Sequence, residues 1–220
     1  MSPSSPRRIS PAALWAACLA PSPGKMAALF GPGATRLALR AVAAPLLAGA
    51  PVVAVDGGNR FDPYEVVRAE RALGGSGRTA LSRLLVSRAF TCHQMEALLS
   101  RRLPETLARS GARTALVLGL PETFDDEDVP YPEACRVFRG CLSALRRLSR
   151  EETRVVLAGE AAARRRPGFQ RYLERTADPL LLLWGEGGGD TLAALGGDTL
   201  PLRPNKIKNV PPGPQFEGEP

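Results

Sequence analysis

Lysine, histidine and cysteine are scarce in this chain of 220 residues. Its only lysines are Lys25, Lys206 and Lys208 and its only histidine is His93, so arginine supplies nearly all the positive charge behind the net +7. The four cysteines include no pair at C-x-x-C spacing, whereas a structural zinc site needs four converging ligands. The sequence therefore predicts neither a metal site nor a disulfide framework, and a cytoplasmic location is the default.

Long apolar runs are also missing, so we expect no membrane-spanning segment and no membrane partner. Residues 1–25 are rich in Pro and Ser, and Pro11–Ala20 within them only loosely resembles a signal peptide. We expect residues 1–25 to be a disordered or mis-assigned extension, residues 26–202 to form one core domain, and residues 203–220 to be a disordered Pro/Gly-rich tail. The arginine excess is partly typical of a GC-rich genome, and so it favours a nucleic-acid partner only weakly.

A glycine-rich turn near the start of the core lacks the lysine that its outline would lead one to expect. The turn contains Gly31, Gly33, Ala34 and Thr35, and it joins a predicted strand over Met26–Phe30 to a helical pattern. A strand, a glycine turn and a helix N-terminus together make the outline of a phosphate-binding loop. Such a loop places a lysine ammonium just before the hydroxyl residue, and here that position is an alanine.

Uniformly apolar runs alternate with amphipathic helical patterns, which predicts an α/β fold with a mostly parallel central sheet and helices on both faces. The expected strands are Met26–Phe30, Pro51–Val55, Leu84–Phe90, Thr114–Leu120 and Thr153–Ala158. The expected helices are Thr35–Ala48 (ended or kinked at Pro45), Pro63–Leu73, His93–Arg102, Pro104–Ser110 after a break, and Tyr131–Arg150. Late strands joined by short turns predict an antiparallel C-terminal edge: Leu180–Trp184, Thr191–Leu195 and Thr199–Leu202.

Three segments together resemble the ATPase core of the RecA/RadA family of strand-exchange recombinases, and the archaeal RadA branch most closely. They are Gly31–Leu37 (GPGATRL), Val55–Pro63 (VDGGNRFDP) and Val86–Met95 (VSRAFTCHQM). The third is the most specific, because Arg-Ala-Phe followed by His-Gln-Met has no origin in local propensity. The resemblance covers roughly residues 26–202 and implies a RecA-like P-loop NTPase core.

The departures from the family pattern fall on its catalytic positions. By the resemblance, the phosphate-loop lysine matches Ala34, the water-activating glutamate matches Gly58, and the magnesium-linked aspartate matches Gly119. The glutamine that senses the γ-phosphate matches Glu160, whose carboxylate would repel a triphosphate. Only Thr35 keeps its expected hydroxyl. Phosphoryl transfer depends on positioning and charge stabilisation, so we expect no catalytic residues, no useful ATP turnover, and no ATP or magnesium as cofactor.

In the family, DNA contacts come from loops after the fourth and fifth core strands, and the loop after Glu160 corresponds to one of them. Its arginines could contact phosphates, and its aromatic residues could stack on bases. The alternative is a solvated helix end with an ordinary aromatic core residue. The expected DNA-binding residues are Arg164, Arg165, Arg166, Phe169 and Arg171, with Tyr172 as a second aromatic.

Other motifs favour plain structural roles. Gly74–Thr79 imitates a phosphate loop, but Arg78 stands at the lysine position and no strand precedes it, so we interpret it as a turn. The acidic run Asp125–Asp128 is interpreted as solvated residues before a helix, with magnesium binding as the alternative. Asp56 at a strand end is expected to form a turn, and His93 to serve helix packing without a catalytic role.

Three hypotheses for function follow. The first is an inactive RecA/RadA-like accessory protein in DNA repair or recombination, which binds a recombinase or another DNA-repair protein, single-stranded DNA, or both. The second is an active or ATP-binding RecA-like ATPase that uses unusual groups, such as Arg36 in place of the lysine. The third is a protein-interaction scaffold with no nucleic-acid role.

Overall fold

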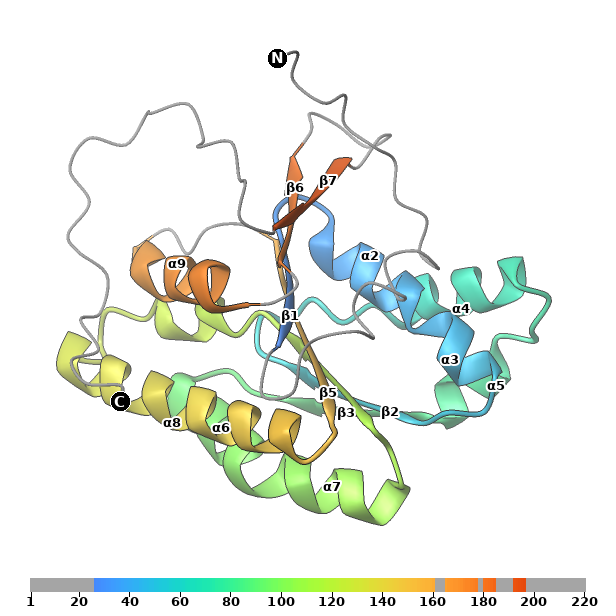
Figure 1. Cartoon of the computed structure of the whole chain (residues 1–220), viewed down its shortest axis with the longest axis horizontal. Helices are drawn as coiled ribbons and strands as arrows, with labels where there is room; N and C mark the ends of the chain where they lie inside the picture. Colours follow the sequence, from blue (N-terminus) through green and yellow to red (C-terminus); the bar gives the residue numbers. More distant parts are fainter. Residues whose placement is uncertain (1–25, 161–164, 178–179, 185–191, 197–220) are drawn as a thin grey trace.

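A computed structural model describes residues 26–160, 165–177, 180–184 and 192–196, and these form one seven-stranded sheet with helices on both faces (Figure 1). The strands lie in the order β3-β2-β4-β5-β1-β6-β7. Their bounds are β1 Ala27–Phe30, β2 Val52–Asp56, β3 Leu84–Arg88, β4 Thr114–Leu118, β5 Arg154–Gly159, β6 Leu180–Trp184 and β7 Leu192–Gly196. The predicted strands are therefore confirmed with small shifts at their ends, and the expected strand Thr199–Leu202 lies outside the described residues.

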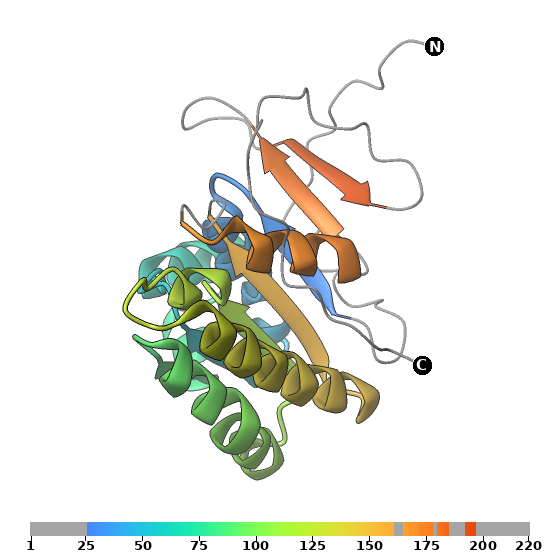
Figure 2. The ribbon, with the colours of Figure 1, turned by 90° about the vertical axis from the view of Figure 1, so that its left-hand side faces the viewer.

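Every pairing from β3 across to β6 is parallel, and only β6 and β7 pair antiparallel. All residues of β1, β2 and β4 are buried, which explains why their sequences are apolar throughout instead of alternating with polar residues. The predicted α/β class, the mostly parallel sheet and the antiparallel C-terminal edge are confirmed. Figures 1 and 2 show the β6–β7 pair standing at one end of the molecule.

The helices form two layers, one on each face of the sheet (Figure 1). One layer consists of α2 Ala34–Ala41, α3 Ala43–Leu47, α4 Pro63–Ala72 and α5 Arg78–Ser82. The other consists of α6 Cys92–Ala97, the π-helical turn η1 Leu98–Arg102, α7 Leu103–Ser110, α8 Tyr131–Arg150 and α9 Pro167–Thr176, with the 3-10 turn η2 Pro121–Phe124 beside it. None of the helices in these described segments has the length and apolarity to cross a membrane.

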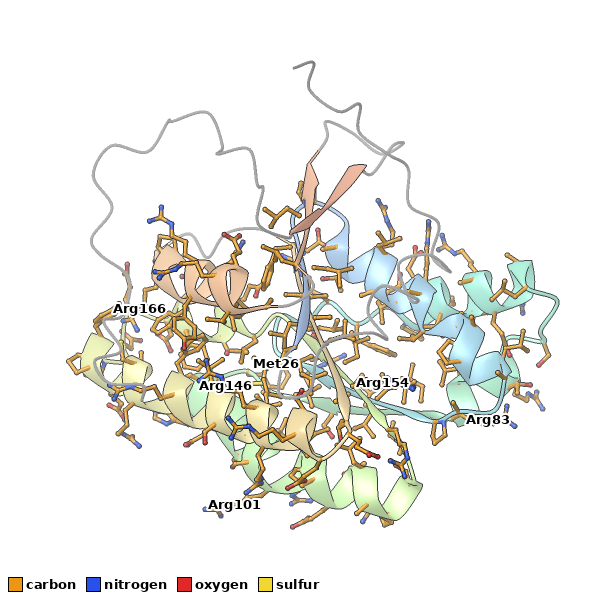
Figure 3. The ribbon with its side chains drawn as sticks, viewed as in Figure 1. Met26, Arg83, Arg101, Arg146, Arg154 and Arg166 are labelled. Atoms are coloured by element: carbon orange, nitrogen blue, oxygen red, sulfur yellow. The ribbon has the colours of Figure 1, made fainter. Side chains whose placement is uncertain are left out.

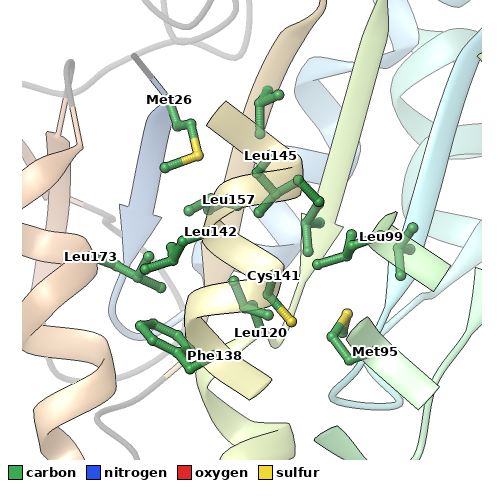
Figure 4. Packing of buried hydrophobic residues seen from close by; sticks show 14 of the residues in the cluster. Met26, Met95, Leu99, Leu120, Phe138, Cys141, Leu142, Leu145, Leu157 and Leu173 are labelled. Carbon is green, nitrogen blue, oxygen red and sulfur yellow. The ribbon is translucent and has the colours of Figure 1, made fainter. Parts of the chain in front are cut away.

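Alternate residues of β1, β2, β4 and β5 point to opposite layers, which divides the core in two. In β1, Ala27 and Leu29 pack with the α2–α5 layer, whereas Ala28 and Phe30 pack with the α6–α9 layer. The second cluster is the larger, and Figure 4 shows Leu142 of α8 packed against Leu157 of β5. Because both faces of the sheet are covered, polar groups can gather only at the ends of its strands.

Two prolines affect the helices in different ways. The expected interruption near Pro45 is confirmed, because the helix divides at Val42 into α2 and α3. A break was also expected before Pro104, and this was wrong, since η1 joins α6 to α7 through a wider turn. Pro104 has no N–H to give to the carbonyl of Ser100, and the Arg147 guanidinium approaches that carbonyl at 3.5 Å. The side chain thus partly replaces the lost backbone bond.

Three short elements were not predicted, namely α5, η2 and α9. The most consequential is α9, because the sequence analysis treated most of its length as a DNA-binding loop. Pro167 occupies the first turn of α9, and Phe169 and Leu173 lie one helical turn apart and are both buried. A proline at a helix start followed by apolar residues at i and i+4 was the signal that could have identified this helix.

At the carboxyl edge of the sheet, the strand order places side by side strands whose connections leave toward opposite layers. The chain leaves β1 and β2 toward the α2–α5 layer, but it leaves β4 and β5 toward the α6–α9 layer. The neighbouring pairs β1/β5 and β2/β4 are therefore places where the connections diverge. Such divergence opens a crevice beyond the strand ends, where α/β proteins bind ligands. We call these places the β1–β5 gap and the β2–β4 gap.

Candidate functional site

The β1–β5 gap contains the glycine turn that the sequence singled out. Gly31 and Gly33 have φ values of 121° and 79°, which L side chains rarely adopt, and Gly33 immediately precedes α2. The N–H of Ala34 donates to the carbonyl of Gly31 at 3.1 Å, so the turn is held by its own backbone. We call Gly31, Gly33, Ala34 and Thr35 the cradle. It presents backbone N–H groups at the positive end of a helix, as an anion site does.

A carboxylate of the same chain is bound to this cradle. The N–H of Gly33 donates to Oε2 of Glu160 at 2.9 Å. Glu160 directly follows β5, and the parallel pairing of Phe30 with Gly159 brings the two strand ends together. The negative charge that a helix N-terminus favours is thus supplied from within the protein. Glu160 was expected only to repel a triphosphate, and the structure places its carboxylate in contact with the cradle itself.

Thr35 is the cradle residue whose side chain agrees with the family pattern that the sequence resembles. It is 3 % exposed, and its Oγ1 has no hydrogen-bond partner among the described residues. A buried hydroxyl without a partner is costly, since it has given up its bonds to water. The hydroxyl is therefore the least satisfied polar group of the cradle.

A second carboxyl group lies beside the cradle, and the sequence analysis missed it. Glu122 of η2 follows β4, and its Oε1 lies 3.2 Å from the place where a Cβ on Gly159 would be. Burial raises the pKa of Glu122 to about 7; nearby backbone N–H groups and Arg60 oppose this rise, and Asp125 adds to it. Both carboxylate oxygens of Glu122 are buried, and neither has a hydrogen-bond partner among the described residues. The only sequence signal was an acidic residue soon after the end of an apolar strand.

The β2–β4 gap is closed by backbone. The N–H of Gly57 donates to the carbonyl of Leu118 at 2.7 Å, and Gly119 has a φ of 64°. A Cβ on Gly119 would lie 2.5 Å from the N and 2.7 Å from the Cα of Gly58. We call Gly57, Gly58 and Gly119 the glycine clasp. Gly58 and Gly119, which the resemblance matched to two catalytic positions, therefore touch each other, and Gly119 has no room for a side chain.

Asp56, at the end of β2, holds the loop that carries part of the clasp. Its carboxylate is fully buried and accepts the backbone N–H groups of Arg60 at 3.0 Å and Phe61 at 3.2 Å. The guanidinium of Arg88 lies 3.3 Å away and balances its charge. The predicted turn-forming role of Asp56 is confirmed.

The acidic run after η2 binds the arginine segment before α9. Oδ1 of Asp125 accepts the backbone N–H groups of Arg165 at 3.2 Å and Arg166 at 2.9 Å. The carboxylate of Glu127 lies 3.3 Å from the Arg165 guanidinium. Within the described residues, no group of three or more His, Cys, Asp or Glu side chains is arranged to hold a metal ion. The acidic run thus pairs with the guanidinium of Arg165 and holds the backbone of Arg165 and Arg166, two residues that the sequence analysis assigned to DNA.

The expected DNA-binding residues are not presented together. Phe169 is fully buried and packs on Phe124 and Phe138 with ring centroids 5.2 and 4.8 Å apart, so its expected stacking on bases is wrong. It is the ordinary core aromatic of the alternative interpretation. Arg166 donates to the carbonyl of Val129 at 2.6 Å and is only partly exposed. The remaining residues of the set are Arg165 and Arg171, which are exposed, and Arg164, which lies outside the described residues.

The second glycine loop, Gly74–Thr79, has a carboxylate beneath it. Glu70 is fully buried, and its Oε1 accepts the N–H of Ala80 at 3.1 Å. A Cβ on Gly75 would lie 2.6 Å from Cγ of Glu70, so the loop packs directly on this side chain. A phosphate would meet a negative charge there, in agreement with the predicted turn.

In comparisons with known proteins, no family model and no curated protein matches this chain.

Proposed function

We propose that this chain is a catalytically inactive protein with a RecA/RadA-like P-loop core, which acts in DNA recombination or repair by binding other molecules. The α/β sheet and the strand–glycine turn–helix arrangement of β1 and α2 support the P-loop assignment. The three segments that resemble the recombinase core support the RecA/RadA branch. The observation that carries the proposal is the Gly33 N–H bonded to the Glu160 carboxylate at 2.9 Å.

Loss of hydrolysis follows from three separate defects. Ala34 supplies no cation for the phosphates, and loss of a single preorganised donor already costs a hundred-fold or more in rate. Glu160 holds the N–H of Gly33 that a phosphate oxygen would need. Gly119 leaves no room for an aspartate, because its Cβ would overlap the backbone of Gly58. These defects affect binding, charge and metal support independently, so no single substitution restores turnover.

The function that remains for such a core is recognition. In this proposal the chain binds a recombinase or another DNA-repair protein, together with DNA, and changes the partner's activity without using nucleotide. The competing hypothesis is a scaffold that binds only proteins. The test below distinguishes the two hypotheses by whether the chain affects strand exchange or binds DNA.

The test uses the full-length chain and its Glu160→Gln variant. Phosphate release from ATP with Mg²⁺, with and without single-stranded DNA, should stay at the no-enzyme rate for both proteins. Calorimetric titration with ATP and Mg²⁺ should give no heat of binding for the unmodified chain. The chain should also alter the strand-exchange rate of an authentic recombinase from the same source. Metal-dependent phosphate release would establish the ATPase hypothesis instead, and no effect on strand exchange or DNA would favour the scaffold.

A further inference from the structure

We infer that the outer face of α8 is a docking surface for the phosphate backbone of duplex DNA, an inference that rests on the DNA-binding part of the proposed function. Six positions of α8 form one continuous row on its solvent face. The row consists of Pro132, Arg136, Arg139, Ser143, Arg147 and Arg150. We call it the arginine stripe. Four of its six members are arginines and none is acidic.

The packing of α8 on the sheet determines which way the arginine stripe faces. The apolar residues of α8 that face the sheet, such as Phe138, Cys141 and Leu145, are fully buried in the larger core cluster. With this face fixed, the stripe must face solvent over the whole helix. Arg136 to Arg150 spans about 21 Å at 1.5 Å per residue. Figure 3 shows Arg101 of the neighbouring turn η1, whereas Arg146 of α8 lies toward α9, where its guanidinium donates to the hydroxyl of Tyr172 at 2.8 Å.

The neighbouring turn η1 widens the basic surface. Arg101 and Arg102 are exposed on η1, and the contact between the Arg147 guanidinium and the Ser100 carbonyl at 3.5 Å shows that η1 lies beside the stripe. The carboxylates here include Glu133, which lies 3.8 Å from Arg136, Glu96 of α6, whose side chain lies against Gly140, and Glu105 of α7. The arginines of the stripe and of η1 outnumber these carboxylates, so positive charge dominates this face.

The stripe differs from the arginine segment before α9. There, Asp125 and Glu127 engage Arg165 and its backbone, so a phosphate would have to compete with carboxylates already in place. Within α8 itself no acidic residue occurs from Arg139 to Arg150, and the neighbouring carboxylate of Glu96 lies against Gly140. The excess of arginine over carboxylate thus favours polyanion binding on α8 over the loop that the sequence analysis selected.

The form of the stripe favours a duplex over a single strand. Proteins that bind single strands combine arginines with aromatic platforms on which bases stack, and the stripe contains no aromatic residue. One strand of a duplex carries a phosphate about every 3.4 Å along the axis, so the stripe matches about six phosphate steps. Contacts made only to phosphates carry no sequence information, so binding should not depend on sequence.

The test measures the affinity of the full-length chain for a labelled duplex and for one of its strands by fluorescence anisotropy across a salt titration. The stripe variant combines Arg139→Gln, Arg147→Gln and Arg150→Gln. A control with the same charge change combines Arg68→Gln, Arg71→Gln and Arg78→Gln, which are exposed on the opposite helix layer. We expect the stripe variant to lose roughly 2 to 3 units of the slope of log affinity against log salt, and the control to keep its slope.

A third variant tests whether lost binding is due to misfolding. Lysine at the same three stripe positions keeps the charge, and it should bind the duplex nearly as well as the unmodified chain. Equal salt slopes for the stripe variant and the unmodified chain would overturn the inference, as would tighter binding of the single strand. If duplex binding were lost only in the double variant Arg165→Gln, Arg171→Gln, the DNA would bind at the loop before α9. That result would overturn the inference about α8 and leave the proposed function in place. If the unmodified chain binds no DNA at all, the inference fails together with the DNA-binding part of that function, while the prediction of no ATP hydrolysis is unaffected.

Discussion

The β1–β5 gap and the β2–β4 gap lie at the same edge of the sheet, yet they are filled in different ways. In the first, the cradle keeps its backbone shape, and the side chain of Glu160 takes one of its N–H groups. In the second, the loops themselves have closed, and Gly58 and Gly119 pack backbone to backbone. One gap is occupied by a side chain that a substitution can remove. The other is occupied by main chain, which no substitution can remove.

If the chain descends from a nucleotide-hydrolysing core, as proposed, this difference indicates two physical routes by which its catalytic positions were lost. Glu160 satisfies an anion site by a charge-assisted hydrogen bond, so the site still exists when the carboxylate is taken away. The glycine clasp removes the space that an aspartate side chain would need, so restoring the carboxylate at Gly119 would force the loops apart. Substitutions in the two gaps should therefore have opposite outcomes, namely recovered anion binding in one and loss of folding stability in the other.

The largest effect is expected in the β2–β4 gap, for Gly119→Ala. A Cβ there would overlap the backbone of Gly58, and the positive φ of 64° adds strain of its own. We expect a loss of roughly 3 to 5 kcal/mol in the free energy of unfolding, measured by urea denaturation. Gly111→Ala is the matched control, because Gly111 has a similar φ of 67° but nothing within 4 Å of its Cβ. It should lose only about 1 to 2 kcal/mol, and equal losses at the two sites would refute the closed clasp.

The next largest effect is a pH dependence at the border of the β1–β5 gap. Burial raises the pKa of Glu122 from 4.5 to about 7, so the folded chain holds this proton more tightly than the unfolded chain. Stability from this group is complete below pH 4.5 and is lost as the pH rises toward 7, by about 3 kcal/mol in total. In Glu122→Gln, unfolding measured from pH 5 to 8 should lose this slope, and the exposed control Glu151→Gln should keep it. A slope unchanged in Glu122→Gln would assign the proton to another group.

The sequence predicted the strands well because burial on both faces leaves a direct trace, an uninterrupted apolar run such as Thr114–Leu118. It also located both gaps, since glycines stand at Gly33, Gly58 and Gly119 where strands end. It could not say how the gaps are filled. That Glu160 bonds to Gly33 depends on the pairing of β1 with β5, which brings together residues 127 positions apart.

The stacking role predicted for Phe169 was wrong for a similar reason. A run of arginines near Phe169 has the composition of a nucleic-acid loop, but composition does not reveal that Asp125 lies opposite. The burial of Phe169 against Phe138 is a property of α9, which the sequence analysis did not recognise. No function was predicted for the arginines of α8, because their significance depends on the surrounding charges.

A smaller effect is expected for Glu160→Ala, which empties the cradle. Loss of a charge-assisted hydrogen bond to a backbone N–H should cost about 1 to 2 kcal/mol of folding stability. The variant should then bind pyrophosphate, detected as a rise in melting temperature with added ligand, whereas the unmodified chain should show none. Glu151→Ala, on the exposed turn after α8, is the control for a simple change in net charge. If both variants respond equally to pyrophosphate, the anion binds elsewhere.

The smallest effect concerns the hydroxyl left in the cradle. Oγ1 of Thr35 is buried without a hydrogen-bond partner among the described residues, so Thr35→Val removes an unsatisfied polar atom and keeps the shape of the side chain. We expect a gain of up to about 1 kcal/mol in the free energy of unfolding. In a phosphate loop that still binds Mg²⁺ and nucleotide, the same change would remove a ligand and weaken binding. A stabilised Thr35→Val variant would thus mark a cradle that no longer needs its hydroxyl, and a destabilised one would mean that the hydroxyl has a partner that the described residues do not supply.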